Sequence, residues 1–363
     1  MTDPIVLFKS GLDGYNTYRI PALLMLGNGR LLAFCEARRD TCEDYGKIDI
    51  VLRMSDDNGK TFTPQCVIAQ YGNDTIGNPC PVFDRETGRV WLFLNTNLAQ
   101  GTEYEINLNK APREVGEIHS DDFGRTWSPF HNLTKTLKRP GWTWYATGPC
   151  HAIQLESGRL VIPCNHGVFD SELGDTRVYQ PHVIISDDHG ATWRIGGTVD
   201  SCGNENTIET LSDGRIYLNA RNMYNNNKYR IVSLSDDGGE TWAPAHEETQ
   251  LPDPMCQASV IAYSKAVEGC TRPLLFVNNP NVPSKKRGEA RRDLSVRISL
   301  DDGNTWSGGL RLLNGRTAYS DLAVLPDGNV ACMYECGAAG PYERIEFKCM
   351  SVEEIMREGE AVE

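Results

Sequence analysis

SDDFGRTW, at residues 120–127, is one of five copies of an eight-residue pattern in this chain. The other copies are SDDNGKTF at residues 55–62, SDDHGATW at 186–193, SDDGGETW at 235–242 and SLDDGNTW at 299–306. The shared Asp can bond to its own backbone two residues on, and the shared Gly allows a positive φ, so each copy predicts a tight turn. The final aromatic residue is expected to anchor the returning strand in the core. Five copies of one turn are an internal repeat, which indicates the architecture more strongly than composition does.

A second motif recurs between these octamers, namely two strand-like runs joined by Asn-Gly or Asp-Gly. Such dipeptides favour two-residue hairpin turns. A third strand leads into each octamer and a fourth leaves it. The hairpin segments are IPALLMLGNGRLLAFCEAR, NTIETLSDGRIYLNAR and DLAVLPDGNVACMYE, with turns at Asn28-Gly29, Asp213-Gly214 and Asp327-Gly328.

The repeat predicts an all-β fold, specifically a six-bladed β-propeller of four-stranded antiparallel blades with five of these turns. Five units carry an octamer, and the 57 residues after Trp306 supply a sixth unit without one. No low-complexity linker interrupts the chain. A single domain spanning residues 1–363 is therefore the simplest prediction.

Composition and charge narrow the possible functions. The net charge of −13 argues against nucleic-acid binding, which needs a basic face. No segment approaches the length of a membrane span. The N-terminal MTDPIVLFKSG lacks a basic segment followed by a long apolar one, which predicts a cytoplasmic location. The twelve Cys form no CxxC pair and no zinc spacing, so we expect neither a disulfide framework nor a metal.

The hairpins predict where polar side chains meet, because residues equidistant from a turn lie opposite each other. This spacing pairs Arg19 with Arg38, Glu205 with Arg221, and Tyr319 with Glu335. The innermost strand of a propeller blade begins at the face where ligands bind. The three hairpins should therefore place these pairs close together at the ligand-binding face. This predicts an anion site with a Tyr and carboxylates beside it.

The segment YRIP at residues 18–21, followed by Asp-containing octamers, resembles the signature of the sialidase (exo-α-neuraminidase) family. The resemblance covers essentially the whole chain. It implies that the protein is a retaining exo-α-sialidase that releases terminal α-linked sialic acid from sialylated glycans. It implies no metal and no organic cofactor.

By this resemblance, three arginines hold the substrate carboxylate, since planar guanidinium groups match carboxylate oxygens. The first is Arg19 in YRIP and the second is Arg221 in LNARN. The third lies in ARRDLSVRIS, where the family pattern selects Arg291 with Arg292 as the alternative.

Two further residues match family positions around these arginines. Glu335 in CMYECG matches the carboxylate that holds the first arginine. Arg38 in CEAR matches an arginine near C4 of the substrate.

The resemblance also assigns the reacting groups. The segment AYSDL places the nucleophile at Tyr319. The anomeric carbon of the substrate already bears a carboxylate, which would repel a carboxylate nucleophile but not a neutral phenol. Glu205 in GNENTIETL matches the base that activates it. We also expect the surrounding arginines to favour phenolate. DYGKIDI places the general acid at Asp44, with Asp40 as the alternative.

The chain departs from the family pattern in a few places and leaves several functions open. Tyr18 stands where Phe is usual, and Asn206 and Thr207 where Cys-Gln is frequent. Alternatives are transfer to another sugar, a preference for the related nonulosonic acid Kdn, a non-catalytic glycan-binding propeller, or a structural scaffold. The sequence carries no signal for linkage preference or oligomeric state. Candidates for the acetamido and glycerol contacts are Asn78, Trp144, Tyr145 and Tyr179.

Overall fold

The computed structural model describes residues 1–172, 174–223, 229–280 and 289–359, and within them the chain is built almost entirely from antiparallel strands. The strands form successive groups, and within a group most strands pair with the next strand in sequence. The first group holds β2 (Thr17–Met25), β3 (Leu31–Arg38), β4 (Ile48–Ser55) and β5 (Cys66–Ala69). The second holds β6 (Thr75–Phe83), β7 (Val90–Asn97), β8 (Arg113–Ser120) and β9 (His131–Asn132).

In the third group, two short strands share the innermost position. These are β10 (Trp142–Thr147) and β11 (Ile153–Gln154), which both pair with β12 (Leu160–Asp170), followed by β13 (Asp175–Ser186) and β14 (Arg194–Thr198). The fourth group holds β15 (Gly203–Thr210), β16 (Ile216–Asn222), β17 (Tyr229–Ser235) and β18 (His246–Pro252).

The last two groups bring the ends of the chain together. The fifth holds β19 (Ser259–Ala262), β20 (Leu274–Asn278), β21 (Ser295–Ser299) and β22 (Leu310–Arg311). The sixth combines β23 (Arg316–Val324), β24 (Val330–Gly337) and β25 (Arg344–Met350) with the N-terminal β1 (Ile5–Lys9). The first two groups form one eight-stranded sheet through a single parallel pair, Ile48 with Thr75.

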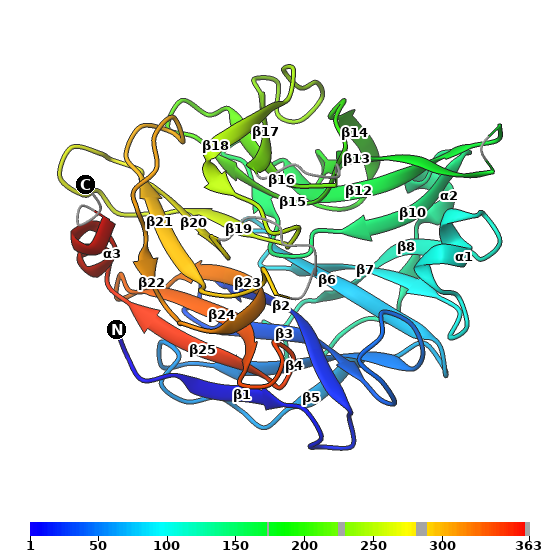
Figure 1. Ribbon diagram of the computed structural model, residues 1–363, viewed down its shortest axis with the longest axis horizontal. Helices are drawn as coiled ribbons and strands as arrows, with labels where there is room; N and C mark the ends of the chain where they lie inside the picture. The colour runs from blue at the N-terminus through cyan, green and yellow to red at the C-terminus, as the bar shows by residue number, and fades with distance from the viewer. Residues whose placement is uncertain (173, 224–228, 281–288, 360–363) are drawn as a thin grey trace.

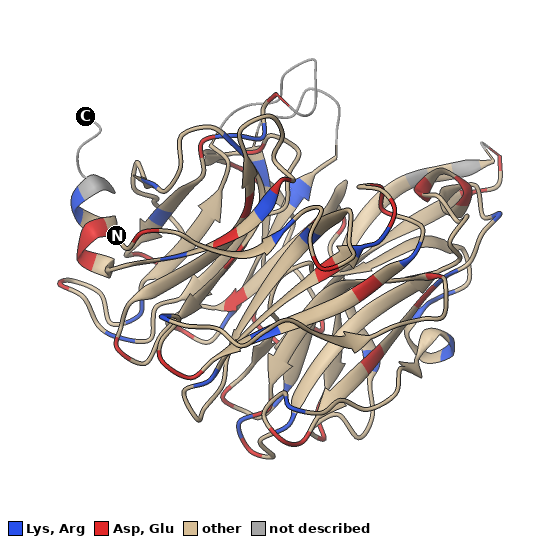
Figure 2. Ribbon diagram, turned by 90° about the horizontal axis from the view of Figure 1, so that it is seen from below, with Lys and Arg blue, Asp and Glu red and all other residues tan. Residues whose placement is uncertain are grey.

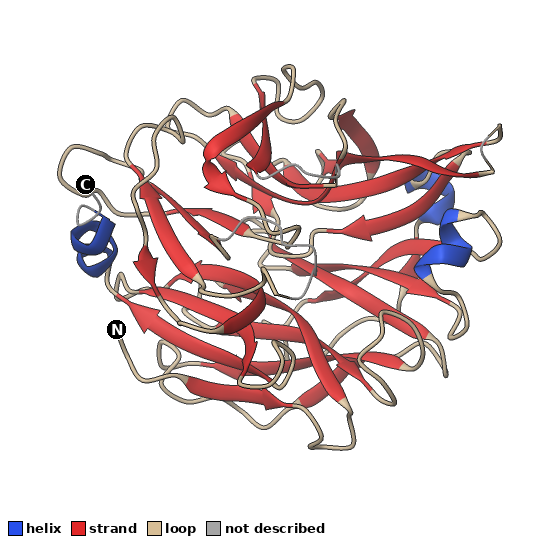
Figure 3. Cartoon of the chain, in the orientation of Figure 1, coloured by secondary structure: helices blue, strands red, loops and turns tan. Residues whose placement is uncertain are grey.

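The groups are arranged around a common centre (Figure 1). The innermost strands contact one another there, β2 with β6 and β23, and β19 with β15 and β23. Three short helices, α1 (Glu103–Asn107), α2 (Thr134–Leu137) and α3 (Val352–Gly359), lie at the periphery (Figure 3). None of the described helices has the length and hydrophobicity needed to cross a bilayer. Acidic and basic residues are interspersed over the loops at both edges of the sheets (Figure 2).

The five octamers form the predicted turns, each between the third and fourth strand of its group. In the turn at residues 186–193, the Asp188 carboxylate accepts from Thr192 N at 2.8 Å and Thr192 Oγ1 at 2.6 Å. Gly190 N donates to Ser186 Oγ at 2.8 Å. The same bonds recur in the other four turns.

The closing aromatic residue of each octamer reaches the core between neighbouring groups, which confirms the expected anchor. The buried hydrophobic residues form a separate cluster between each pair of successive groups, including the sixth and the first. The octamers therefore pack one group onto the preceding one. Ring pairs across these boundaries are Phe62 with Phe347 at 5.0 Å, Trp127 with Phe34 at 5.8 Å and Trp193 with Phe93 at 4.7 Å.

The octamer glycine is required for two reasons, which a matched pair of variants can separate. Gly190 has φ +87°, and a Cβ there would lie 2.2 Å from Trp91 Cζ2. Gly214, in a hairpin turn, has φ +88° but nothing within 4 Å of such a Cβ. We expect Gly214→Ala to cost about 1–2 kcal/mol for the left-handed backbone alone. Gly190→Ala should have the same backbone cost and lose about 1–3 kcal/mol more, because the new methyl group overpacks against Trp91. Urea denaturation measures both, and equal losses would contradict this account.

Candidate active site

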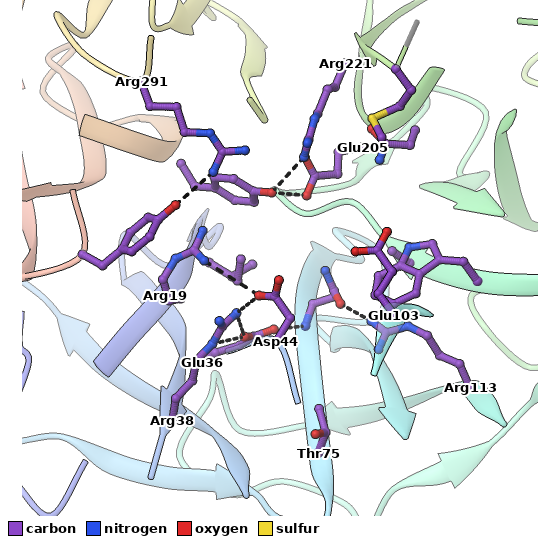
Figure 4. A pocket seen from close by; sticks show the side chains of 18 residues that line it. Arg19, Glu36, Arg38, Asp44, Thr75, Glu103, Arg113, Glu205, Arg221 and Arg291 are labelled. Carbon is purple, nitrogen blue, oxygen red and sulfur yellow. Dashed lines mark hydrogen bonds and ion pairs between the residues drawn. The ribbon is translucent and has the colours of Figure 1, made fainter. Parts of the chain in front are cut away.

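A cavity of about 250 Å³ opens where the inner strands converge, and seven of the eight predicted site residues line it (Figure 4). The eighth, Glu335, is fully buried behind the wall. Its carboxylate accepts from Arg19 Nε at 2.8 Å, Ile20 N at 2.8 Å and Tyr319 N at 3.0 Å. The seven residues that line the cavity are Arg19, Arg38, Asp44, Glu205, Arg221, Arg291 and Tyr319.

β-Bulges aim these side chains into the cavity. The register shifts in β2 between Arg19 and Ala22, in β15 between Gly203 and Asn206 and in β23 between Thr317 and Ser320. An extra residue in one strand bends it and redirects the neighbouring side chains. The predicted pairing of Arg19 with Arg38 is wrong because the hairpin is centred on Asn28, with Met25 opposite Leu31, and because the bulge in β2 shifts the register by one further residue. Arg19 lies opposite Glu36, and Arg38 lies opposite Thr17.

Tyr319, Glu205 and Arg221 form one hydrogen-bonded unit at the cavity wall. The Tyr319 hydroxyl donates to Glu205 Oε1. Arg221 Nη1 donates to Glu205 Oε2 at 2.6 Å and to the Tyr319 hydroxyl oxygen at 3.3 Å. The phenol is therefore held between a carboxylate that can take its proton and a cation that can stabilise its oxyanion.

The pKa shifts in this unit correct one expectation. Burial and the Glu205 charge raise the pKa of Tyr319 well above its usual value of 10.0, and they outweigh Arg221, Arg291 and Arg19. The arginines therefore do not make Tyr319 a phenolate in the unliganded protein. Burial acts to raise the pKa of Glu205 as well, but Arg221 and the Tyr319 hydroxyl lower it overall. The resting pair is a neutral phenol beside an ionised carboxylate, which is the state that a general base requires.

Arg221 and Arg291 present donors that no described part of the protein satisfies. Arg291 donates to the Tyr342 hydroxyl oxygen at 3.1 Å and to Met255 O at 2.8 Å. Three other nitrogens are buried without a hydrogen-bond partner among the described residues. They are Nε of Arg291 and both Nε and Nη2 of Arg221. Unsatisfied buried donors are costly, so these nitrogens favour an anionic ligand in the cavity.

Arg291 and Arg292 differ in whether they reach the cavity. The Arg291 side chain lines the cavity and is only 6% exposed as a residue. The Arg292 side chain is 54% exposed and pairs with Asp293 at 3.0 Å, away from the cavity.

Asp44, and not Asp40, reaches the cavity from the loop after β3. Its Oδ1 lies 2.6 Å from Arg38 Nη2 and 3.8 Å from Arg19 Nη1. Burial alone would raise the pKa of Asp44, but the two guanidinium groups hold it well below its usual value. The side chain is 61% exposed, so solvent screens part of this effect.

Four charged or aromatic residues at the cavity were not predicted. Glu36 accepts from Arg38 Nη2 at 2.7 Å and from Asn78 N at 2.8 Å, and an acidic residue inside the apolar run LLAFCEAR was a usable signal for it. The Tyr342 ring lies 3.9 Å from the Arg19 guanidinium, from a loop without a recognisable pattern. Arg113 and Glu103 also line the cavity, from β8 and α1.

The four candidates for the acetamido and glycerol contacts divide into two pairs. Asn78 and Trp144 line the cavity. Tyr145 is fully buried in the core, where its hydroxyl bonds to His182 at 2.9 Å. Tyr179 does not line the cavity, and its hydroxyl donates to Glu103 Oε1 at 2.9 Å.

Comparisons with known proteins identify the family of this chain. A model of the BNR repeat-like domain family matches residues 29–332. A sialidase from Micromonospora viridifaciens is 33% identical over 353 residues, which are 93% of this chain and 52% of that protein. Sialidase-3 from Mus musculus is 30% identical over 403 residues, with 96% of this chain and 94% of that protein covered.

Solved structures show the same fold. The structure of the Hadza microbial sialidase Hz136 superposes with a TM-score of 0.84 at 28% identity, over 97% of this chain and 69% of that one. The family model covers most of the chain, and a relative at 30% identity is covered over nearly its whole length. This chain is a member of the sialidase family.

Proposed function

We propose that the protein is a retaining exo-α-sialidase that hydrolyses terminal α-linked sialic acid from glycans. The observation that carries the proposal is a set of buried guanidinium nitrogens of Arg221 and Arg291 beside the Tyr319–Glu205 pair, for which the described residues supply no hydrogen-bond partner. This combination fits a substrate that carries a carboxylate on its reacting carbon. The chain spans 52% and 64% of the Micromonospora viridifaciens and Bacteroides fragilis sialidases, so activity is proposed from the site itself.

The scaffold of this site is proposed to be a six-bladed β-propeller. The strand groups follow one another around the centre, and a separate core cluster fills each boundary between them. Pairing of β1 with β25 places the N-terminal strand in the last group. This arrangement joins the ends of the chain and supports a closed ring.

In the first step, the substrate carboxylate binds Arg19, Arg221 and Arg291. The Tyr319 oxygen attacks the anomeric carbon while its proton passes to Glu205, and the bond to the departing sugar oxygen breaks. Protonated Asp44 donates to that oxygen. A substrate carboxylate near Arg19 adds negative charge close to Asp44, which raises the pKa of Asp44 and favours its protonation.

In the second step, Asp44 is ionised and removes a proton from water, which attacks the same carbon. The tyrosyl bond breaks, and the phenol oxygen recovers its proton from Glu205. Two displacements at one carbon retain the α configuration.

Proton NMR of the reaction with an α-2,3-sialylated lactose tests the proposed function. We expect the α anomer of the free sugar to appear first and then to mutarotate to the β anomer. Initial β product, or no release from this and other α-sialosides, would contradict the proposal.

The choice of third arginine gives a paired prediction. Arg291→Met removes donors to the substrate carboxylate, and loss of a charged hydrogen bond of about 1.5–3 kcal/mol lowers kcat/KM by about ten- to a hundredfold. Arg292→Met is the matched control, and we expect its kcat/KM to stay close to that of the wild type. Hydrolysis of an aryl α-sialoside measures both, and equal effects would contradict the assignment of Arg291.

A further inference from the structure

Arg113 is a buried arginine of the cavity wall that the proposed mechanism does not use. Its residue exposure is 3%, and it is the first residue of β8. Nε donates to Tyr145 O and Nη1 to Asn97 Oδ1, both at 2.6 Å, and Nη2 donates to Asn78 Oδ1. The guanidinium carbon lies 4.0 Å from the centre of the Trp144 ring. The hydrogen-bond acceptors of this cation among the described residues are thus all neutral.

This environment differs from that of most arginines at the cavity. Arg19, Arg38 and Arg221 each form an ion pair with a carboxylate. Arg113 forms none with any carboxylate that the structure describes, and burial lowers its pKa to about 10. Each of its two terminal nitrogens uses one of its two N–H groups in the bonds above. Two N–H groups therefore remain for a ligand, at a cation that no described carboxylate contacts directly. Glu36, Glu103 and Asp44 lie around the same cavity and act on Arg113 only through their charge.

The position of Arg113 in the cavity indicates which ring carbon of the substrate carries the substituent that faces it. Arg113 lies across the cavity from Arg291 (Figure 4). In a six-membered nonulosonic acid ring, the atom opposite the anomeric carbon C2 is C5. If C2 lies at Tyr319 and its carboxylate at the arginines, the C5 substituent faces Arg113 and Trp144.

The chemistry of this wall favours an oxygen substituent over an acyl group. The methyl of an acetamido group gains by packing against an apolar surface, and an aromatic face is the best such surface. The guanidinium of Arg113 covers the face of Trp144 at 4.0 Å. A hydroxyl group is small, and its oxygen accepts from a guanidinium N–H, which is a charge-assisted bond.

We propose that Arg113 makes this site prefer a nonulosonic acid with a hydroxyl group at C5, that is, a deaminated sialic acid, over one with an acetamido group. This inference deepens the proposed function and rests on it for the placement of the ring. It assigns Arg113 as the residue that determines specificity at C5.

Binding of two unreactive analogues tests the inference without turnover. The 2,3-didehydro-2-deoxy forms of the two acids, with hydroxyl or acetamido at C5, are titrated calorimetrically into the wild-type protein. We expect the hydroxyl analogue to bind about tenfold more tightly, as one charged hydrogen bond allows. Equal affinities, or tighter binding of the acetamido analogue, would overturn the inference even if the sialidase reaction itself is found.

The variant Arg113→Met links the preference to this residue. Met keeps an unbranched side chain over Trp144 but removes the donors and the charge. We expect the ratio of the affinity for the hydroxyl analogue to the affinity for the acetamido analogue to fall about tenfold. An unchanged ratio would overturn the role of Arg113.

Arg139→Met is the matched control for this variant. The Arg139 guanidinium lies 5.6 Å from the Trp142 ring centre, and Arg139 does not line the cavity. We expect its affinity ratio to equal that of the wild type. Failure of the proposed function would appear separately, as absence of α-sialoside hydrolysis by the wild type on either sugar.

Discussion

Replacing Tyr319 with Phe is expected to lower kcat/KM for α-sialosides by on the order of 10³-fold or more, since the attacking oxygen is lost and only binding and electrostatic effects remain. The variant should fold, because the residue is 6% exposed and Phe fills the same space. Release of 4-methylumbelliferone from aryl α-glycosides of both C5 types measures the effect.

Tyr334→Phe is the matched control for this variant. Tyr334 is buried on the neighbouring strand β24, and its hydroxyl donates to Glu346 Oε2 at 2.9 Å outside the cavity. We expect this variant to keep nearly full activity. A Tyr319→Phe protein with kcat/KM within tenfold of the wild type would exclude Tyr319 as the nucleophile.

Glu205→Gln is expected to lower kcat by about 10²- to 10⁴-fold, the range that positioned proton transfer contributes. The amide cannot take the proton of Tyr319, although it can still accept a hydrogen bond. The pH profile carries a further signature. The base must be ionised to act, and the pKa of Glu205 lies below its usual value. Wild-type activity should therefore persist as the pH falls and be lost only when the pH drops below this lowered pKa. This acidic limb of the pH profile should be absent in the variant.

Glu209→Gln controls for the loss of a carboxylate on the same strand. Glu209 lies toward the other end of β15, is 7% exposed and pairs with Arg272 at 3.3 Å away from the catalytic cavity. We expect this variant to retain kcat and the acidic limb. Equal loss of kcat in both variants would show that Glu205 acts through stability and not as the base.

Features encoded by local sequence could be predicted correctly. The octamer turns depend on bonds within eight residues, such as Asp188 with Thr192, so the pattern alone specifies them. Hairpin spacing predicted that Tyr319 and Glu205 lie at the same opening, and the family resemblance predicted that they are partners; the two residues form a hydrogen bond in the structure.

Features that depend on distant contacts could not be predicted. The spacing rule failed for Arg19 for two reasons. The hairpin is centred on Asn28, with Met25 opposite Leu31, and the bulge in β2 shifts the register by one further residue, so that Arg19 lies opposite Glu36. The neutral state of Tyr319 results from burial by several groups of strands, which no local pattern reports. Arg113 also carries no local signal, since its role depends on Trp144 and Asn78 from other strands.

Covalent trapping of Tyr319 tests the central claim most directly. A 2,3-difluorinated sialic acid, with a hydroxyl or an acetamido group at C5, is an activated substrate whose 3-fluorine slows the second displacement. After incubation with the wild-type protein, intact mass and peptide mass spectrometry locate the adduct. The account predicts one added sugar, attached to the Tyr319 oxygen. An adduct on Glu205 or Asp44, or turnover of both probes to the inverted anomer without any adduct, would contradict it.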